Sequence, residues 1–234
     1  YGSDPLTAGV VEKIRDIFEA PDAAVYMVAT GTAANALALA TLAKPWDTIF
    51  CTSLSHINED ECNAPELFTG GAKLTALSTG DKLGPEALEK AIVNLAGRGV
   101  HGPQLGPVSL TQVSEKGTIY TLDEIDVIVA IAKAYGMPVH MDGARFANAL
   151  IALNCSPAEM TWKRGIDALS FGCSKNGLMS AEAVIFFDPS CAWEFELRRK
   201  RSGHLFSKYR FLSAQIKGYL DNDLWLTLAR QANE

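Results

Sequence analysis

Lys175 is the residue whose surroundings in this sequence best suit covalent chemistry. It lies in Ser170-Phe171-Gly172-Cys173-Ser174-Lys175-Asn176-Gly177, just after a short apolar stretch typical of a buried strand. An amine held among small residues at the end of a strand can be partly desolvated and can react with a carbonyl group. The alternative, an ordinary surface lysine, stays open when this segment is considered alone.

A second candidate is Thr30-Gly31-Thr32, which lies between an apolar stretch and an alanine-rich segment. Free backbone amides at the start of a helix, a hydroxyl group and the helix dipole together favour the binding of a phosphate. The spacing matches neither the P-loop nor the dinucleotide-binding glycine motif. The alternative is that Gly31 only permits a tight turn between a strand and a helix.

Asp142 and Arg145 form a third candidate, directly after the apolar stretch Val139-His140-Met141. Their position predicts a carboxylate and a guanidinium group at the carboxyl end of a strand. The alternative is a structural salt bridge between them, because carboxylates and guanidinium groups pair readily.

His56, in Ser53-Leu54-Ser55-His56-Ile57, is the fourth candidate. An imidazole can stack on an aromatic cofactor and accept a proton near neutral pH. A metal site formed with Glu59 and Cys62 lacks a recurring ligand spacing, so we expect no metal here. A structural histidine is the remaining alternative.

Taken together, these candidate sites indicate one particular cofactor. Pyridoxal phosphate needs a phosphate site, a carboxylate that keeps its pyridine nitrogen protonated, and a lysine that forms a Schiff base with its aldehyde. The sequence offers Gly31 and Thr32, then Asp142, then Lys175. We therefore predict pyridoxal phosphate as the cofactor and a reaction that breaks carbon bonds of an amino acid.

The elements that must position these residues alternate between strand and helix along the chain. Short apolar stretches predict strands at 24–29, 47–51, 72–77, 108–113, 139–141, 168–171 and 183–187, and helical periodicity predicts helices at 4–18, 33–43, 84–95 and 125–135. A capping box, Thr121 to Glu124, precedes the last of these helices. This order predicts an α/β fold with a mostly parallel sheet, helices on both faces, and ligands at the carboxyl ends of the strands.

Composition narrows the function further. The 234 residues are 48% hydrophobic and 21% charged, which argues against a disordered or fibrous protein. A net charge of -6 argues against nucleic acid as a partner, and no apolar run approaches the roughly 20 residues of a membrane span. Five cysteines without Cys-x-x-Cys spacing favour a reducing, cytoplasmic location. We expect a small-molecule substrate, and the abrupt start at Tyr1 suggests a fragment.

The chain resembles the threonine aldolases of the aromatic-amino-acid β-eliminating lyase group, whose large domain has the fold of the type I pyridoxal-phosphate enzymes. Nearly the whole chain takes part in the resemblance. It rests on Tyr1-Gly2-Ser3-Asp4-Pro5, Thr30-Gly31-Thr32-Ala33-Ala34-Asn35, Ser55-His56-Ile57, Pro138-Val139-His140-Met141-Asp142-Gly143-Ala144-Arg145 and Ser170-Phe171-Gly172-Cys173-Ser174-Lys175. Residues 174–179 and 203–206 resemble the low-specificity L-type branch, which includes members acting on phenylserine-like substrates.

The resemblance implies roles for the cofactor-binding residues. Gly31 and Thr32 would hold the phosphate, and His56 would stack on the cofactor ring. Asp142 would bond the pyridine nitrogen. Arg145 would anchor the cofactor or the carboxylate of the substrate.

The resemblance also implies a reaction with Lys175 and His56 as the catalytic residues. Lys175 would form the Schiff base, from which a β-hydroxy-α-amino acid such as L-threonine, L-allo-threonine or phenylserine displaces it. The β-hydroxyl would lose its proton, the Cα–Cβ bond would break, and glycine and an aldehyde would result. A β-eliminating lyase, racemase or aminotransferase using the same Lys175, or a non-catalytic cofactor-binding fragment, is the alternative.

The resemblance finally implies how the chain is organised and assembled. Residues 1–190 would form the large domain, and residues 191–234 would lead toward a smaller C-terminal domain that the sequence does not contain. Active sites in this family lie between subunits, which implies a homodimer or homotetramer. The basic run 198–201 favours either a solvated helix face or an intersubunit contact, in which Arg201 or Lys208 approaches the phosphate of a neighbour.

Overall fold

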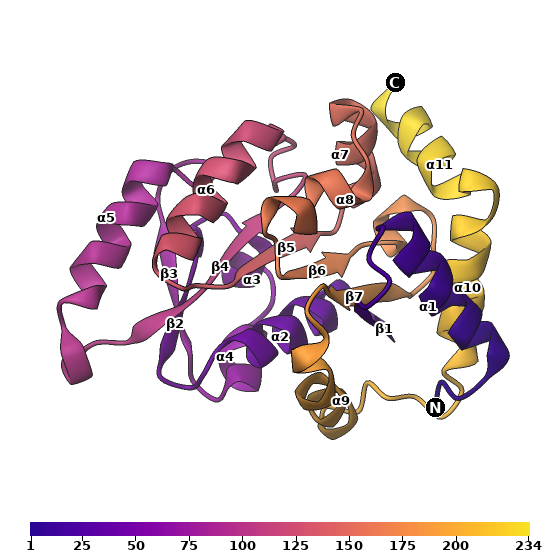
Figure 1. The fold of residues 1–234 in the computed structure, drawn as a ribbon, viewed down its shortest axis with the longest axis horizontal. Coiled ribbons are helices and arrows are strands. Elements are labelled where there is room, and N and C mark those ends of the chain that lie inside the picture. Colours follow the sequence, from indigo (N-terminus) through magenta and orange to yellow (C-terminus); the bar gives the residue numbers. More distant parts are fainter.

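A seven-stranded sheet forms the centre of the molecule in the computed structural model, which describes all residues 1–234 (Figure 1). The strands follow one another across the sheet in the order β1-β7-β6-β5-β4-β2-β3. Only β7 runs against its neighbours β1 and β6, so the predicted mostly parallel sheet is confirmed. The strands are β1 (Ala24–Val28), β2 (Asp47–Thr52), β3 (Lys73–Leu77), β4 (Gln104–Thr111), β5 (Val139–Gly143), β6 (Ala168–Phe171) and β7 (Glu182–Phe186).

Helices cover both faces of this sheet, as predicted. On one face lie α2, α4 and α9, and on the other lie α1, α5, α6, α7 and α8 (Figure 1). The helices are α1 (Pro5–Ile17), α2 (Gly31–Leu42), α3 (His56–Glu59), α4 (Ala64–Thr69), α5 (Pro85–Ala96), α6 (Leu122–Ala134), α7 (Phe146–Leu153), α8 (Pro157–Met160), α9 (Ala192–Arg201), α10 (Arg210–Leu220) and α11 (Leu224–Asn233). None of them combines the length and the apolar character needed to span a lipid bilayer.

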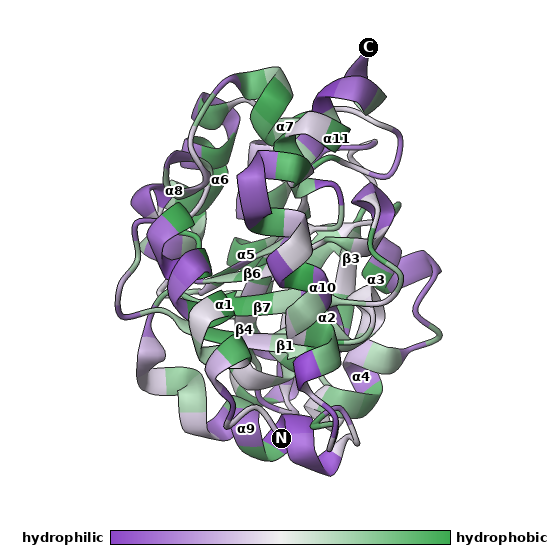
Figure 2. Cartoon of the chain, turned by 90° about the vertical axis from the view of Figure 1, so that its right-hand side faces the viewer, coloured by the Kyte–Doolittle hydropathy of each residue, from purple (hydrophilic) through white to green (hydrophobic).

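The core follows from the hydropathy of these elements. Strands β2, β5, β6 and β7 are buried along their whole length, and Figure 2 shows hydrophobic strands inside and polar residues on the outer helices. Helix α2 is buried from Ala33 to Ala40, because the sheet covers one side of it and α4 and α9 cover the others. A helix surrounded in this way needs small apolar residues on every side, which explains why it is rich in alanine.

Local sequence signals fix where the main helices begin. Asp4 caps α1, and Pro5 follows at its first position. Thr121 and Glu124 form the predicted capping box of α6, with both reciprocal hydrogen bonds present. Thr30 caps α2 through a hydrogen bond that its side-chain oxygen accepts from the amide of Ala33.

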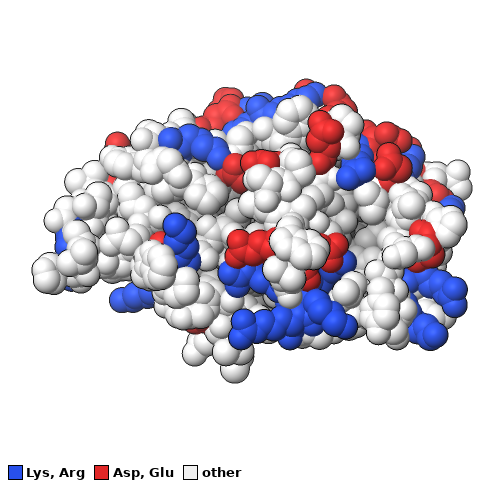
Figure 3. Space-filling view, turned by 60° about the horizontal axis from the view of Figure 1, so that its bottom comes forward, with Lys and Arg blue, Asp and Glu red and all other residues white.

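The basic run at the end of α9 does not form a uniformly solvated face. Figure 3 shows Lys and Arg side chains gathered on the side of the molecule that carries α9. Arg199, however, is only 4% exposed and lies 4.9 Å from the ring centres of both Tyr26 and Tyr209. The prediction of a solvated face is therefore wrong for Arg199, whose guanidinium also donates to the Tyr209 hydroxyl.

Candidate active site

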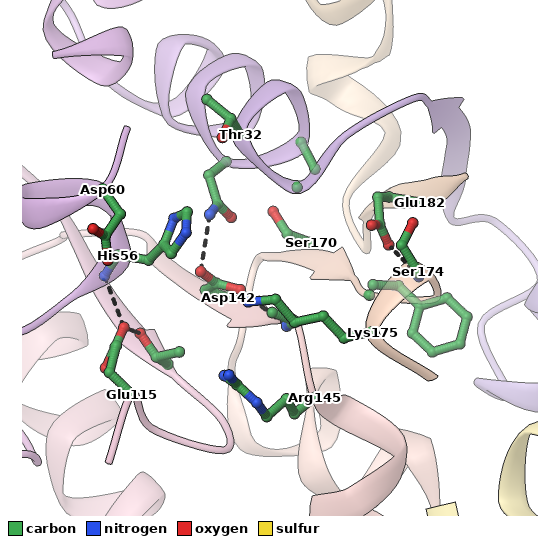
Figure 4. Close-up of a pocket in the computed structure, with 17 residues that line it drawn as sticks. Thr32, His56, Asp60, Glu115, Asp142, Arg145, Ser170, Ser174, Lys175 and Glu182 are labelled. Carbon is green, nitrogen blue, oxygen red and sulfur yellow. Dashed lines mark hydrogen bonds between the residues drawn. The ribbon is translucent and has the colours of Figure 1, made fainter. Parts of the chain in front are cut away.

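A cavity of about 280 Å³ opens at the carboxyl edge of the sheet. Parallel strands end at this edge, and the antiparallel β7 begins there, so the segments that follow β1, β2, β4, β5 and β6 meet the first residue of β7. The cavity is lined by Gly31, Thr32, Ala34, Asn35, His56, Asp60, Thr111, Glu115, Asp142, Ala144, Arg145, Ser170, Phe171, Gly172, Ser174, Lys175 and Glu182 (Figure 4). All six residues predicted to bind the cofactor lie in this one lining.

Lys175 lies in a single 3-10 turn, η3 (Ser174–Asn176), directly after β6. Figure 4 shows its side chain extending toward Asp142. Lys175 is exposed, because it faces an open cavity rather than packed side chains.

Two glycines bring the segments of Lys175 and Asp142 together. The amide of Gly172, after β6, donates to the carbonyl of Gly143, at the end of β5, over 3.0 Å. A Cβ atom on Gly172 would lie 2.5 Å from the Cα of Ala144, and one on Gly143 would lie 2.8 Å from the carbonyl oxygen of Ser170. Only glycine therefore permits this approach of the two backbones.

Asp142 is 4% exposed, and its carboxylate is held from two sides. Its Oδ2 accepts a hydrogen bond from Asn35 Nδ2 over 2.9 Å, and its Oδ1 accepts one from the amide of Ala144 over 2.9 Å. No ion pair joins Asp142 to Arg145, so the alternative of a structural salt bridge is wrong. All ion pairs of the chain involve other residues, which leaves the guanidinium of Arg145 and the amine of Lys175 unneutralised.

Gly31 and Thr32 form the first turn of α2 rather than a separate turn before it. Their amides precede the first intrahelical hydrogen bond and carry the positive end of the helix dipole. A Cβ atom on Gly31 would meet no protein atom within 4 Å. Packing within the chain therefore does not require glycine at this position, which borders the cavity.

His56 begins the short helix α3, where sequence alone suggested only a polar stretch. Its backbone amide donates to Glu115 Oε1 over 2.8 Å, and its ring Nδ1 lies 2.9 Å from Glu61 Oε1. The hydrogen bond to Glu61 raises the pKa of His56, although burial acts in the opposite direction. Glu59, considered above as a metal ligand, instead accepts a hydrogen bond from Asn58.

Sequence reasoning missed several polar residues of the site. Glu115 and Glu182 line the cavity, and Glu182 accepts hydrogen bonds from the amides of Cys173 and Ser174 in the turn before Lys175. Asn35 binds Asp142 from α2. For Asn35 and Glu182 the available signal was an amide or carboxylate within an otherwise apolar helix or strand, since such a group needs a buried partner.

Comparison with known proteins agrees with this geometry. The family model of the beta-eliminating lyases matches residues 1–234. Two curated relatives, the low specificity L-threonine aldolases of Pseudomonas sp. (strain NCIMB 10558) and of Pseudomonas aeruginosa, are each 44% identical over the whole chain, which covers 67% of their length.

Solved structures give the same result. The threonine aldolase of Leishmania major superposes on the whole chain with a TM-score of 0.93 at 29% identity, and the chain covers 67% of it. A putative L-allo-threonine aldolase from Listeria monocytogenes, 18% identical, superposes on 98% of the chain with a TM-score of 0.76, and 61% of that protein is covered. The fold is thus that of the threonine aldolases and the other type I pyridoxal-phosphate enzymes. The cavity at the sheet edge, the match along the full sequence and the superposition place this chain in the beta-eliminating lyase family.

Proposed function

We propose that this chain is a pyridoxal-phosphate-dependent lyase of the threonine aldolase type. It cleaves a β-hydroxy-α-amino acid, such as L-threonine, L-allo-threonine or phenylserine, to glycine and an aldehyde. The observation that carries this proposal is the meeting of an unneutralised amine, Lys175, with the buried carboxylate of Asp142 and the imidazole of His56 in one cavity. The names of the curated relatives support the same reaction.

The residues present fit the cofactor. The first amides of α2 and the hydroxyl of Thr32 suit a phosphate, and the open space beside Gly31 leaves room for it. Asp142 keeps lone pairs free after accepting its two hydrogen bonds, so it can also accept one from a protonated pyridine nitrogen. The amine of Lys175 is free to hold the cofactor covalently.

When bound, pyridoxal phosphate supplies an electron sink that stabilises the negative charge left on the Cα atom after its bond is broken. The chain contributes position and proton transfer. Asp142 holds a proton on the pyridine nitrogen, because its buried negative charge favours the cationic form of a hydrogen-bonded partner. Lys175 would hold the cofactor through its amine until the amino group of the substrate takes that place.

His56 and Arg145 act on the substrate itself. His56 would stack on the cofactor ring and would accept the proton of the β-hydroxyl group, which would allow the Cα–Cβ bond to break. Arg145 anchors the cofactor or the substrate carboxylate, because its planar donors match two carboxylate oxygens and no acid of the chain neutralises it.

Product analysis tests this proposal. The chain is titrated with pyridoxal phosphate while the absorbance near the visible edge is followed, and threonine or phenylserine is then added. We expect an absorbance band followed by release of glycine and the matching aldehyde. Pyruvate or ammonia would instead indicate β-elimination, and a band without turnover would indicate a cofactor-binding protein without lyase activity. The Pseudomonas aeruginosa relative serves as the positive control.

We further infer a homodimer or homotetramer with shared active sites, and a cytoplasmic location. The family resemblance supports the assembly, and the exposed Arg201 and Lys208 fit the suggested contact with a neighbouring phosphate site. The five unpaired cysteines support the location. The division into a large domain, residues 1–190, and a helical segment, residues 191–234, also stays a prediction. Light scattering with and without the cofactor measures the subunit number.

A further inference from the structure

Glu61 is a buried carboxylate behind His56 that the proposed reaction does not use. It lies between α3 and α4, and its side chain is 0% exposed. Its Oε1 atom is 2.9 Å from His56 Nδ1 and 2.8 Å from Asn35 Nδ2, whereas its Oε2 atom is buried without a hydrogen-bond partner. No lysine or arginine pairs with it, so His56 is the only group in contact with Glu61 that can carry a positive charge.

Asn35 connects this pair to the cofactor carboxylate. Its Nδ2 group donates one hydrogen bond to Glu61 and another, over 2.9 Å, to Asp142 Oδ2. Figure 4 shows the ring of His56 beside Asp142, with a dashed line for a hydrogen bond that the Asp142 carboxylate accepts. Because both neighbours of this amide group are carboxylates, its nitrogen must face them, and its Oδ1 atom is left without a partner. A continuous set of hydrogen bonds thus runs from His56 through Glu61 and Asn35 to Asp142.

We propose that Glu61 is a positioning residue that fixes His56 with a proton on Nδ1, so that Nε2 is left to accept the proton of the substrate. The pairing stands on the geometry above, while the role of Nε2 rests on the proposed function. Only Nδ1 of the ring forms a hydrogen bond in the structure, and the half-buried ring borders the cavity. A hydrogen bond at one ring nitrogen determines which nitrogen remains free to react.

A purely structural role explains Glu61 less well. Burying a carboxylate is unfavourable unless charge and hydrogen bonds compensate for it. A glutamine could accept the same hydrogen bonds from Asn35 and His56 without that cost. The charge of Glu61 therefore has a use only if it acts on His56, its one ionisable contact.

The other charged groups around His56 set the direction of its pKa. Glu61 and Asp142 raise the pKa of His56, while burial and the charge of Lys175 lower it. Burial keeps the pKa of Glu61 above its usual value, although the hydrogen bonds from His56 and Asn35 act in the opposite direction. Glu115 contacts the backbone amide of His56 rather than the ring. Removing the charge of Glu61 is thus expected to lower the pKa of His56.

Nitrogen and carbon NMR of the histidine rings tests the pairing without any turnover. The chain has four histidines, and the signal of His56 is the one missing from the His56→Asn spectrum. We expect the neutral ring in the wild-type chain to carry its proton on Nδ1, and its pKa to fall in Glu61→Gln. Glu59→Gln is the matched control, because it removes the same charge two residues away from an exposed side chain that does not contact His56.

The cofactor-loaded enzyme gives a second readout. If neutral His56 accepts the proton, the acid limb of the kcat/KM profile lies at its pKa, so Glu61→Gln should move this limb to lower pH. We also expect kcat to fall about ten-fold with KM little changed, since His56 stays in place but becomes a weaker base without the negative charge of Glu61. Glu59→Gln should leave both the profile and kcat unchanged.

The outcomes separate this inference from the proposed function. A wild-type ring with its proton on Nε2, or an unchanged pKa of His56 in folded Glu61→Gln, overturns the role of Glu61 even if glycine is released. If Glu61→Gln does not fold, the position of the proton in the wild-type ring decides alone. Failure to release glycine while the Nδ1 proton is present overturns the proposed reaction and leaves the pairing in place.

Discussion

At the scale of single residues, the cavity is defined by two cations that no acid of the chain neutralises. Lys175 and Arg145 both border it, and neither forms an ion pair, although acidic side chains lie in the same lining. Elsewhere in the chain, Lys82, Lys133 and Lys163 all pair with carboxylates. The free cations suit an anionic ligand, such as a cofactor phosphate or an amino-acid carboxylate.

Replacing Lys175 by alanine should abolish the absorbance band that pyridoxal phosphate forms with the chain, because no other amine borders the cavity. Activity should disappear with it. A titration of the Lys175→Ala variant measures this, with Lys90→Ala, an exposed lysine of α5, as the control. An unchanged spectrum in the Lys175 variant would show that another amine carries the chemistry.

Replacing His56 by asparagine should keep cofactor binding but slow cleavage by about 100-fold. Asparagine remains polar, yet its amide cannot accept a proton as imidazole does, and a positioned base contributes roughly 10²–10⁴-fold. Single-turnover rates and a cofactor titration separate the two effects. A turnover equal to that of the wild type would contradict the role of His56 as the proton acceptor.

The residues found from sequence share one property: each is a reactive group in an unusual local setting. Lys175 among small residues and Asp142 after an apolar strand were recognisable in this way. Glu61 and Glu115 were not: the hydrogen bond of Glu61 to Asn35 spans 26 positions and that of Glu115 to His56 spans 59, although Glu61 lies only five residues after His56. Long-range hydrogen bonds of this kind leave no pattern of spacing in the sequence.

At the scale of elements, the amino terminus of α2 provides the anion site of the cavity. Thr30 caps the helix from outside the cavity lining, while Gly31 and Thr32 border it. Capping of the helix and lining of the cavity thus belong to different residues among three consecutive ones. Helix α2 itself is fixed by burial on all sides, so its amino terminus is held rigidly at the sheet edge.

Replacing Thr32 by valine should weaken cofactor binding about ten-fold and change the free energy of unfolding by less than about 0.5 kcal/mol. The hydroxyl forms no structural hydrogen bond, whereas one to a charged phosphate is worth about 1.5–3 kcal/mol. Thr41→Val, at the other end of α2, should leave the affinity unchanged. Equal affinities of wild type and Thr32→Val would remove Thr32 from the phosphate site.

Strand and helix identities were largely predictable because their hydrophobic periods differ, but some boundaries were not. β4 begins at Gln104 rather than at 108, despite Gly106 and Pro107, which usually interrupt strands. The glycine is needed there, because a Cβ atom on Gly106 would lie 2.6 Å from the carbonyl oxygen of Thr48 on β2. The register of β2 against β4 shifts at the same place. The need for glycine at this position is visible only once the pairing of β4 with β2 is known.

At the scale of the whole molecule, the C-terminal helices hold the turn that carries the reactive amine. Asn176 is 8% exposed, and its Nδ2 group donates to the hydroxyl of Tyr219 on α10 over 2.7 Å and to the carbonyl of Trp225 on α11 over 2.8 Å. Both rings belong to the same buried cluster as β5 and β6. The segment after residue 190 therefore supports the site that precedes it.

Replacing Asn176 by alanine should lower the free energy of unfolding by about 2 kcal/mol or more and also weaken cofactor binding. The change leaves a buried hydroxyl and a buried carbonyl without their donor, at about 1–3 kcal/mol for each lost partner. Asn148→Ala is the control, since the half-buried Asn148 donates a solvent-exposed hydrogen bond to the same helix α11. Urea unfolding compares the two variants, and similar losses in both would contradict the anchoring role of Asn176.

The close contact of Gly143 and Gly172 has a consequence for how this site can diversify. The separation of the two backbone segments that carry Lys175 and Asp142 is set by main-chain atoms in contact, with no side chain between them to exchange for a longer or shorter one. Substitutions cannot adjust that spacing gradually, because the smallest added carbon already collides. A descendant of this protein with a new substrate would thus keep the distance between Lys175 and Asp142 and change the opposite wall instead, where Asp60, Thr111 and Glu115 face the cavity.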